Sequence, residues 1–124
     1  MHEKDKALVR RLVDKVINGN ELDLVEELFA PELAEPVRQA FTSFRAAFPD
    51  WREEIVDMVA EGDKIAVRLR CSGTLQGEFM GAKPNGRRQE VDEVFFLRVR
   101  DGRFVEYWGL EDNLARLQQL GAIS

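Results

Sequence analysis

Two carboxylates, Glu111 and Asp112, stand where the sequence EYWGLEDNLARLQQLG passes from a predicted strand to a predicted helix. Aspartate is favoured at the N-cap of a helix, because its side chain accepts a hydrogen bond from a backbone amide of the first turn. A carboxylate beside aromatic residues can also act as a general base, because desolvation raises its pKa. Asp112 is therefore a candidate catalytic residue whose position equally fits a helix cap.

Other side chains near this junction could complete a site. Four aromatic residues are candidates for the wall of an apolar pocket: Trp51, Phe96, Tyr107 and Trp108. Large aromatic residues in strands more often fill a core, so both interpretations stay open. Arg68 and Arg70 share one face of a predicted strand, where they could be solvated or could stabilise an enolate oxyanion. In the pair Asp92 and Glu93, regular strand alternation would direct one side chain inward.

Composition restricts the class of protein. A chain of 124 residues that is 44% hydrophobic suits one domain, residues 1–124, with its own core. The net charge of -5 argues against a nucleic-acid partner. Cys71 is the one cysteine and no Cys/His cluster is present, so we expect neither an internal disulfide nor a metal site. The amino-terminal segment mixes charges and lacks the apolar run of a signal peptide or membrane span, which favours a cytoplasmic protein.

The first half of the sequence has the periodicity of helices. An apolar stripe over residues 8–17, followed by Asn18-Gly19, predicts a first helix. A second, short helix is expected from Asn20, as its N-cap, to Phe29, with Pro31 ending it. A third is expected to begin with Pro36 in its first turn and to run to Pro49.

The second half alternates with the period of strands. Four are predicted: Trp51–Ala60, Lys64–Gln76, Arg88–Arg100 and Arg103–Glu111. The connector Gly77–Gly86 is longer than a hairpin needs, which is typical of loops at pocket mouths. A last helix is expected to bury Leu114, Leu117 and Leu120. This order of elements predicts an α+β domain in which a curved antiparallel sheet wraps over helices.

The last two predicted strands are apolar on both faces. Phe95, Leu97 and Val99 alternate with Val94 and Phe96, and the next strand sets Phe104, Trp108 and Leu110 against Val105 and Tyr107. One face can pack on the helices, whereas the other needs a ligand pocket or a partner subunit. We therefore expect a homodimer or a higher homo-oligomer.

Five segments carry a resemblance to a known family: FPDW (48–51), EGDKIAVR (61–68), SGTLQGEFMGAKPNGR (72–87), VRDGRFVEYW (99–108) and the final D…LQQLG. In this order they resemble the SnoaL-type polyketide cyclases, also called ester cyclases, over most of the chain from Leu8 to Gly121. The resemblance implies the fold of nuclear transport factor 2, a cone-shaped α+β barrel with a deep pocket between sheet and helices. It also implies a dimer or tetramer that uses no metal or organic cofactor.

The resemblance further implies ring closure by intramolecular aldol addition, with an aspartate as acid/base at the position of Asp112. Many relatives have histidines that this chain lacks, and Leu75 and Tyr107 stand at two of their positions. General acid/base work would therefore fall to carboxylates or to Tyr107.

Three functions remain open from the sequence. The first is a cofactor-independent enzyme for an apolar carbonyl compound, with Asp112 as base and an arginine, a tyrosine or water supporting the oxyanion. The second is epoxide hydrolysis, as in limonene-epoxide-hydrolase-like relatives of the fold, using Asp92, Asp112 and Arg68 or Arg70. The third is a non-catalytic module for ligand binding or dimerisation. An arginine that bridges two carboxylates at a bound water would favour epoxide opening.

Overall fold

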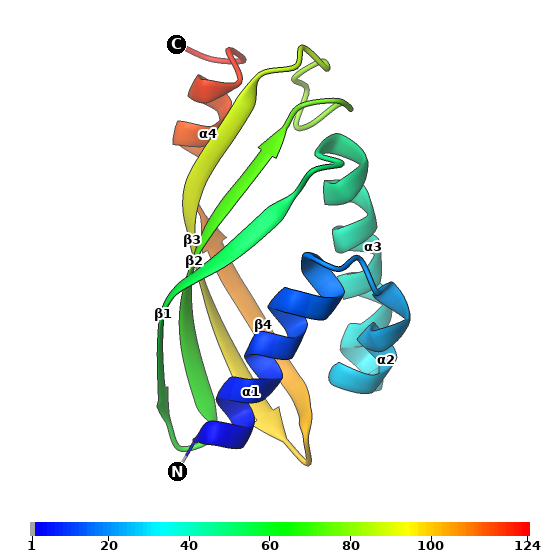
Figure 1. The fold of residues 1–124 in the computed structure, drawn as a ribbon, viewed down its shortest axis with the longest axis vertical. Helices are drawn as coiled ribbons and strands as arrows, with labels where there is room; N and C mark the ends of the chain where they lie inside the picture. Colours follow the sequence, from blue (N-terminus) through cyan, green and yellow to red (C-terminus); the bar gives the residue numbers. More distant parts are fainter. Residues whose placement is uncertain (1) are drawn as a thin grey trace.

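The computed structural model describes residues 2–124, in which helices cover one face of a four-stranded antiparallel sheet (Figure 1). The strands lie in the order of the sequence: β1 (Arg52–Glu61), β2 (Lys64–Thr74), β3 (Arg88–Arg100) and β4 (Arg103–Glu111). The four predicted strands are confirmed, and the bounds of the last two match the prediction at both ends. Alternation in β2 buries Ile65, Val67 and Leu69 against the helices.

The helical elements depart further from the prediction. They are α1 (Glu3–Arg11), its π-helical continuation η1 (Leu12–Ile17), the short η2 (Leu22–Leu24) and α2 (Val25–Leu28), α3 (Pro31–Ala47) and α4 (Asn113–Gln119). Pro31 begins α3 instead of ending the preceding helix. The first backbone amides of a helix have no acceptor within the helix, so the missing N–H of proline costs no hydrogen bond there. The expected start at Pro36 is therefore wrong, and α3 continues through this proline. The N-cap of η2 is Glu21 rather than Asn20, the residue that the sequence had predicted, and Asn20 has a positive φ of 54°.

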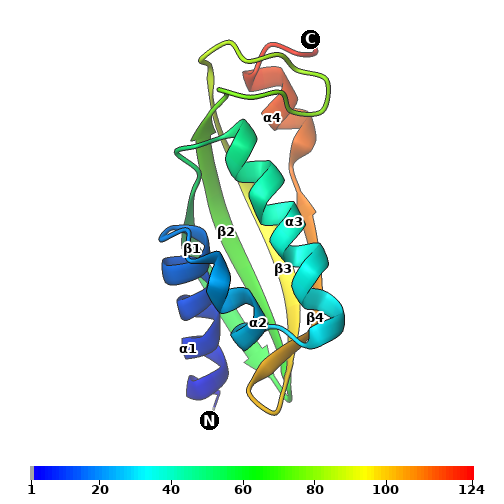
Figure 2. The same cartoon turned by 90° about the vertical axis from the view of Figure 1, so that its right-hand side faces the viewer.

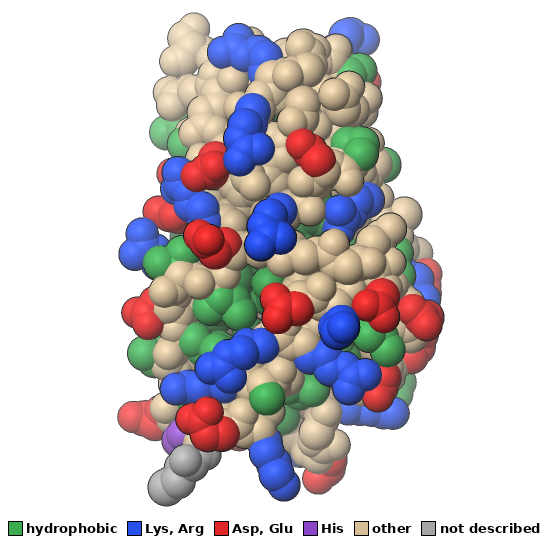
Figure 3. Space-filling model, in the orientation of Figure 1, with side chains coloured by type: hydrophobic (Ala, Val, Ile, Leu, Met, Phe, Trp, Pro, Cys, Tyr) green, Lys and Arg blue, Asp and Glu red, His purple; other side chains and the backbone are tan. Residues whose placement is uncertain are grey.

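Helices α1, α2 and α3 lie on the same face of the sheet, and α4 packs at the end where β4 leaves it (Figures 1 and 2). The core between these layers includes Val9, Phe29 and Phe104, all fully buried. Within residues 2–124, none of the helices is both long and apolar enough to cross a membrane. On the face shown in Figure 3, Lys and Arg are interspersed with Asp and Glu, and neither sign forms a continuous patch there.

A β-bulge in β4 decides which side chains face the helices. The register passes from Arg98 opposite Glu106 to Val99 opposite Phe104, which leaves an extra residue in β4. Phe104 is consequently buried, whereas Trp108 is 55% and Leu110 is 67% exposed. The prediction that these three share one face is therefore wrong.

An exposed apolar surface covers the outer face of the sheet. Four residues stand opposite one another across the strands, namely Val59, Ala66, Phe96 and Trp108. Val94 and Leu110 form the neighbouring pair. Contiguous apolar patches of this kind mark interaction sites in proteins that are otherwise polar outside. We call this set of residues the outer apolar face.

We predict that the outer apolar face is the interface of a homodimer. Leu110→Glu should convert a dimer into a monomer at micromolar concentration, because it places a charge in the apolar contact, with little loss of stability at so exposed a position. Light scattering measures the mass. Thr42→Glu, at an exposed position of α3, is the matched control and should stay dimeric. A wild-type monomer would contradict the prediction.

Candidate functional site

A cavity of about 180 Å³ lies between α3 and the inner face of the sheet. Five aromatic residues line it: Phe41, Phe44, Trp51, Phe95 and Tyr107. Three carboxyl groups also line it, those of Glu53, Glu93 and Glu111. Acidic groups in an aromatic cavity are a default candidate for a functional site, because such walls perturb their protonation.

The aromatic wall depends on close packing at one glycine. The rings of Phe95 and Tyr107 stack with centroids 5.0 Å apart and planes at 15°. Phe95 stands opposite Gly109 of β4, where an added Cβ would lie 2.1 Å from the Phe95 ring. Gly109 therefore lets Phe95 lie against β4. On the other side, Phe41 and Trp51 meet edge to face with centroids 5.5 Å apart.

Glu53 is fixed from two directions. Its Oε2 accepts a hydrogen bond from Trp51 Nε1 at 2.9 Å. The side chain of Asn18, just after η1, bonds both to the backbone amide of Glu53 at 2.8 Å and to its carbonyl at 2.9 Å. The carboxyl group of Glu53 is thus held at a defined position on β1, with only 3% of the residue exposed.

Glu93 and Glu111 stand opposite each other on β3 and β4, and Arg116 of α4 joins them. Arg116 is fully buried; its Nη2 donates to Glu93 Oε2 at 2.9 Å, and its Nη1 donates to Glu111 Oε1 at 2.6 Å. Its Nε donates to Gln89 Oε1 at 3.1 Å. The guanidinium also lies over the ring of Phe44, 5.2 Å from its centroid. One cation therefore holds two of the cavity's three carboxyl groups.

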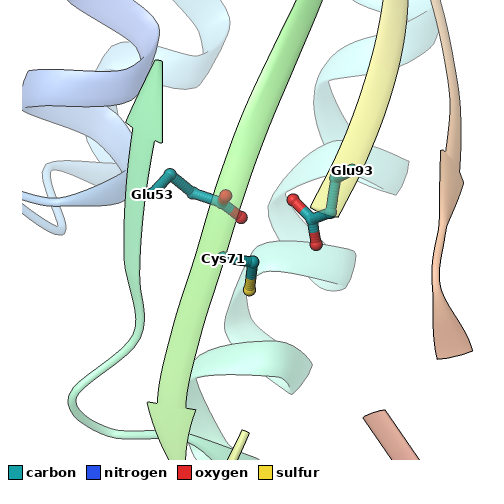
Figure 4. Close-up of side chains that lie close together, drawn as sticks. All are labelled: Glu53, Cys71 and Glu93. Atoms are coloured by element: carbon teal, nitrogen blue, oxygen red, sulfur yellow. The ribbon is translucent and has the colours of Figure 1, made fainter. Parts of the chain in front are cut away.

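Glu53 and Glu93 form a carboxyl pair, by which we mean these two residues throughout. Their side chains point toward each other from β1 and β3, with the Cys71 thiol of β2 beside them (Figure 4). One atom from each of the three groups lies within 4.8 Å of the others. The Oε1 atoms of both glutamates are buried and accept no hydrogen bond from another residue of the described chain 2–124, whereas the two carboxyl groups hydrogen-bond each other.

Burial and mutual repulsion shift the protonation of the carboxyl pair. Loss of water and then the neighbouring Glu53 raise the pKa of Glu93 to about 10, and burial raises the pKa of Glu53. Burial also raises the pKa of Tyr107, so its hydroxyl stays protonated. At neutral pH the pair therefore retains a proton, with one group available as an acid and the other as a base.

The same three groups, Glu53, Cys71 and Glu93, could each offer an atom to a metal ion. Two features favour a proton over a cation. Burial raises the pKa of the Cys71 thiol, which disfavours the thiolate that binds metals. The guanidinium of Arg116, 2.9 Å from Glu93 Oε2, already supplies a positive charge beside the pair. We therefore assign the pair a proton.

The aromatic residues proposed from the sequence lie in two separate places. Trp51 and Tyr107 line the cavity. Phe96 and Trp108 pack against each other on the outer apolar face, with ring centroids 6.0 Å apart. Since β4 alternates beyond its bulge, Tyr107 and Trp108 must point to opposite faces.

Of the charged residues proposed from the sequence, Glu93 and Glu111 line the cavity, and four lie outside it: Arg68, Arg70, Asp92 and Asp112. Arg68 and Arg70 pair with Asp92 on the outer side of the sheet, at 3.4 Å and 3.0 Å. Asp112 is exposed and caps α4, where its Oδ1 accepts from the backbone amide of Ala115 at 3.0 Å. It lines an open hollow on the outer side. The structure thus brings Asp92, Arg68 and Arg70 together on the outer side. Asp112 lies beside Asp92, because its backbone amide donates to the Asp92 carbonyl at 3.2 Å and both aspartates line the same hollow.

Sequence reasoning missed Glu53, Gln89 and Arg116. Alternation from Trp51 puts Glu53 on the same side of β1, which was a usable signal. Arg116 precedes Leu120 by one helical turn, and the two share the buried face of α4. The expectation that α4 buries Leu114 is wrong, because this side chain is 64% exposed. On the buried face of α4, the charged side chain of Arg116 lies where an apolar side chain was expected.

Comparisons with known proteins agree with this fold. A family model described as SnoaL-like polyketide cyclase matches residues 7–120. Aklanonic acid methyl ester cyclase AcmA of Streptomyces galilaeus is 29% identical over 129 residues, covering 93% of this chain and 89% of AcmA. TsrD of Streptomyces laurentii superposes with a TM-score of 0.92 at 25% identity, covering 99% of this chain and 98% of TsrD. IdmH of Streptomyces antibioticus superposes with a TM-score of 0.83 at 32% identity, covering 94% and 97% respectively. The predicted α+β fold is confirmed, and the chain belongs to the SnoaL-like polyketide cyclase family.

Proposed function

We propose that the protein catalyses proton transfer on an apolar carbonyl compound, as in an aldol-type ring closure, with Glu53 and Glu93 as acid and base. One observation carries this proposal. The two buried carboxyl groups face each other at an aromatic cavity and hydrogen-bond each other. The name of AcmA, a cyclase of a methyl ester, supports the same class of reaction.

The reaction requires one base and one acid in the same place. The carboxylate of the pair accepts a proton from the carbon next to a carbonyl group, which gives an enolate. The enolate carbon then bonds to a second carbonyl carbon of the same substrate, and the carboxylic acid donates its proton to the new alkoxide. The pair begins and ends with one proton, so the cycle needs no external acid, base or oxidant.

Neighbouring residues hold the pair in place for this chemistry. Trp51 fixes Glu53 and Arg116 fixes Glu93, each through a hydrogen bond of 2.9 Å. The dipoles and charges are therefore arranged before the substrate arrives, which lowers the cost of reorganisation in the transition state. Tyr107, protonated and in the cavity wall, can donate to the enolate oxygen.

Deuterium exchange tests the proposed acid/base pair directly. The protein should catalyse exchange of the methyl protons of 4-hydroxyacetophenone in D₂O, followed by loss of the ¹H NMR signal. Glu53→Gln and Glu93→Gln should each slow exchange by about a hundredfold or more, because a general base contributes on that order.

Asp112→Asn is the matched control for this assay, since asparagine also caps helices well. It should keep the wild-type exchange rate. A comparable loss in Asp112→Asn would return the acid/base role to the helix cap, as the sequence first suggested. Absence of exchange with the wild-type protein would contradict the proposal.

The retained proton predicts an unusual dependence of stability on pH. The folded pKa of Glu93, about 10, lies above its ordinary value of 4.5. Between these values the folded chain binds more protons than the unfolded chain, so the free energy of unfolding should fall as pH rises. Urea denaturation at about pH 5, 7 and 9 measures it. Glu93→Gln does not titrate and should show a flatter profile; an identical slope in both proteins would refute the retained proton.

Epoxide opening by water is the second candidate, and one observation favours it. Arg116 bridges two carboxyl groups, Glu93 and Glu111, in the cavity wall. In this reaction a carboxylate takes a proton from water, the water oxygen bonds to an epoxide carbon, and a carboxylic acid protonates the departing oxygen. Its carboxylates would be these glutamates, since Asp92, Arg68 and Arg70 lie on the outer face.

Styrene oxide in H₂¹⁸O distinguishes the two candidate reactions. We expect no diol above the uncatalysed background, because the third carboxyl group that lines the cavity, that of Glu111, is already held by Arg116 at 2.6 Å. Mass spectrometry of the diol measures the product and its label. Protein-dependent labelled diol that disappears in Glu93→Gln would replace carbonyl chemistry with epoxide hydrolysis.

A further inference from the structure

We propose that Gln89 and Cys71 are positioning residues for the acid/base reaction. They form a one-way chain of hydrogen bonds from Arg116 to Glu53, which makes Glu53 the base of the carboxyl pair and Glu93 the acid. This assignment of roles rests on the proposed function of the same site. It follows from which atoms of the side chains in the chain can donate a hydrogen bond and which can only accept one.

The strands bring these side chains together on the inner face of the sheet. Glu53 of β1 stands directly opposite Cys71 of β2. Gln89 of β3 stands opposite Gly73, two residues farther along β2 and therefore on the same face as Cys71. Cys71 and Gln89 are both fully buried, so water cannot replace the hydrogen bonds that they make.

Arg116 fixes the orientation of the Gln89 carboxamide. A guanidinium has only donors, so the carboxamide oxygen must face it, and Gln89 Oε1 accepts from Arg116 Nε at 3.1 Å. The carboxamide nitrogen therefore points the other way, where Nε2 donates to Cys71 Sγ at 3.7 Å. The reverse orientation would set the NH₂ group against the guanidinium. The direction of the chain is thus set at its first link.

The Cys71 thiol continues the chain in the same direction. Its sulfur already accepts from Gln89, and burial raises the pKa of the thiol, so the proton stays on the sulfur. That proton is donated to the carboxyl group of Glu53. The sulfur lies within 4.8 Å of an oxygen of each glutamate of the pair (Figure 4). Every link of the chain therefore donates toward Glu53.

The hydrogen bonds that reach Glu53 favour its carboxylate form. Glu53 accepts from Trp51 Nε1 at 2.9 Å, from the Cys71 thiol and from the carboxyl group of Glu93. Burial raises the pKa of Glu53, and these donors oppose the rise. Burial and the charge of Glu53 raise the pKa of Glu93 to about 10. The shared proton therefore resides on Glu93.

Other charged groups around the pair leave this assignment in place. Arg116 attracts negative charge onto Glu93 at 2.9 Å, but its shorter contact, at 2.6 Å, is with Glu111. Glu53 also borders an open groove on the helix side of β1, whose charged residues are Lys6, Arg10, Asp14, Arg52, Glu54 and Asp57. Because the groove opens to solvent, water screens these charges.

With these roles the proton cycle closes inside the pair. Glu53 takes a proton from the carbon next to the carbonyl group, and Glu93 gives its proton to the new alkoxide. Glu53 then holds one proton and Glu93 holds none. The hydrogen bond that joins the two carboxyl groups returns the proton to Glu93, which restores the starting state.

Raman spectroscopy of the thiol tests the direction of the chain without any substrate. The sequence has one cysteine, so the S–H stretching band belongs to Cys71. Its frequency falls when the thiol donates to a carboxylate. Glu53→Gln should raise the frequency, because an amide oxygen is a weaker acceptor, whereas Glu93→Gln should leave it unchanged or lower. A rise in Glu93→Gln that equals or exceeds the rise in Glu53→Gln would overturn the proposal, as would no rise in either.

The same band tests the role of Gln89. Gln89→Met removes the donor that holds the sulfur, so the thiol can turn away from Glu53 and the S–H band should broaden. Val67→Ala, a buried truncation on β2, is the matched control and should leave the band unchanged. A band in Gln89→Met identical to that of the wild type would contradict the role of Gln89.

Two variants of Cys71 test its effect on the reaction. Cys71→Ala removes the donor, so the acid limb of the pH profile for deuterium exchange should move up by about half a pH unit, because a hydrogen bond to a carboxylate lowers its pKa. Cys71→Ser keeps a hydroxyl donor and should restore most of the wild-type profile. Val67→Ala should keep that profile. Equal shifts in the two Cys71 variants, or no shift in Cys71→Ala, would overturn the role of the thiol.

The spectra and the exchange rates separate this assignment from the proposed function. The expected Raman shifts without catalysed exchange by the wild-type protein would contradict the carbonyl chemistry and support the direction of the chain. Catalysed exchange, together with a band that Glu93→Gln raises and Glu53→Gln leaves unchanged, would contradict the assignment of the base alone.

Discussion

The buried guanidinium of Arg116 is the interaction on which the site depends. A buried cation is expensive unless it is paired, and Arg116 is paired with Glu93 and Glu111 while it also bonds Gln89. These bonds fasten α4 to β3 and β4. Without the guanidinium, two like charges would face each other across neighbouring strands, an arrangement that destabilises a sheet. The position of α4 and the charges of the cavity are therefore set by the same side chain.

One cation cannot neutralise three carboxyl groups, and this imbalance explains the retained proton. Asp92, the residue before Glu93 on β3, shows the opposite behaviour. Asp92 points to the solvent side, where hydrogen bonding from Arg70 lowers its pKa. Glu93 points inward, where burial and Glu53 raise its pKa. Two adjacent carboxylic acids thus acquire opposite protonation at neutral pH, because strand alternation sends one to water and the other to an aromatic cavity.

The hydrophobic periodicity of the sequence was enough to predict the strands and the order of the elements. It also predicted that one side chain of the Asp92–Glu93 pair points inward. It was not enough for the site. The bulge in β4 is a single extra residue that no period reports, and it separates Phe104 from Trp108. The carboxyl pair joins β1 to β3, residues 40 apart in sequence (93 minus 53), so only tertiary packing brings them together. Asp112 met every local criterion for a helix cap, and the structure shows that cap.

Strand β4 connects the cavity with the outer apolar face. Tyr107 and Glu111 belong to the inner side, while Trp108 and Leu110 belong to the outer side. Glu111 also borders the outer hollow beside Leu110 and keeps 34% of its side chain exposed. A subunit bound on the outer face would remove water from this carboxylate and weaken the screening of its charge. Because the charge of Glu111 already raises the pKa of Glu93, such an association would strengthen the hold of the carboxyl pair on its proton.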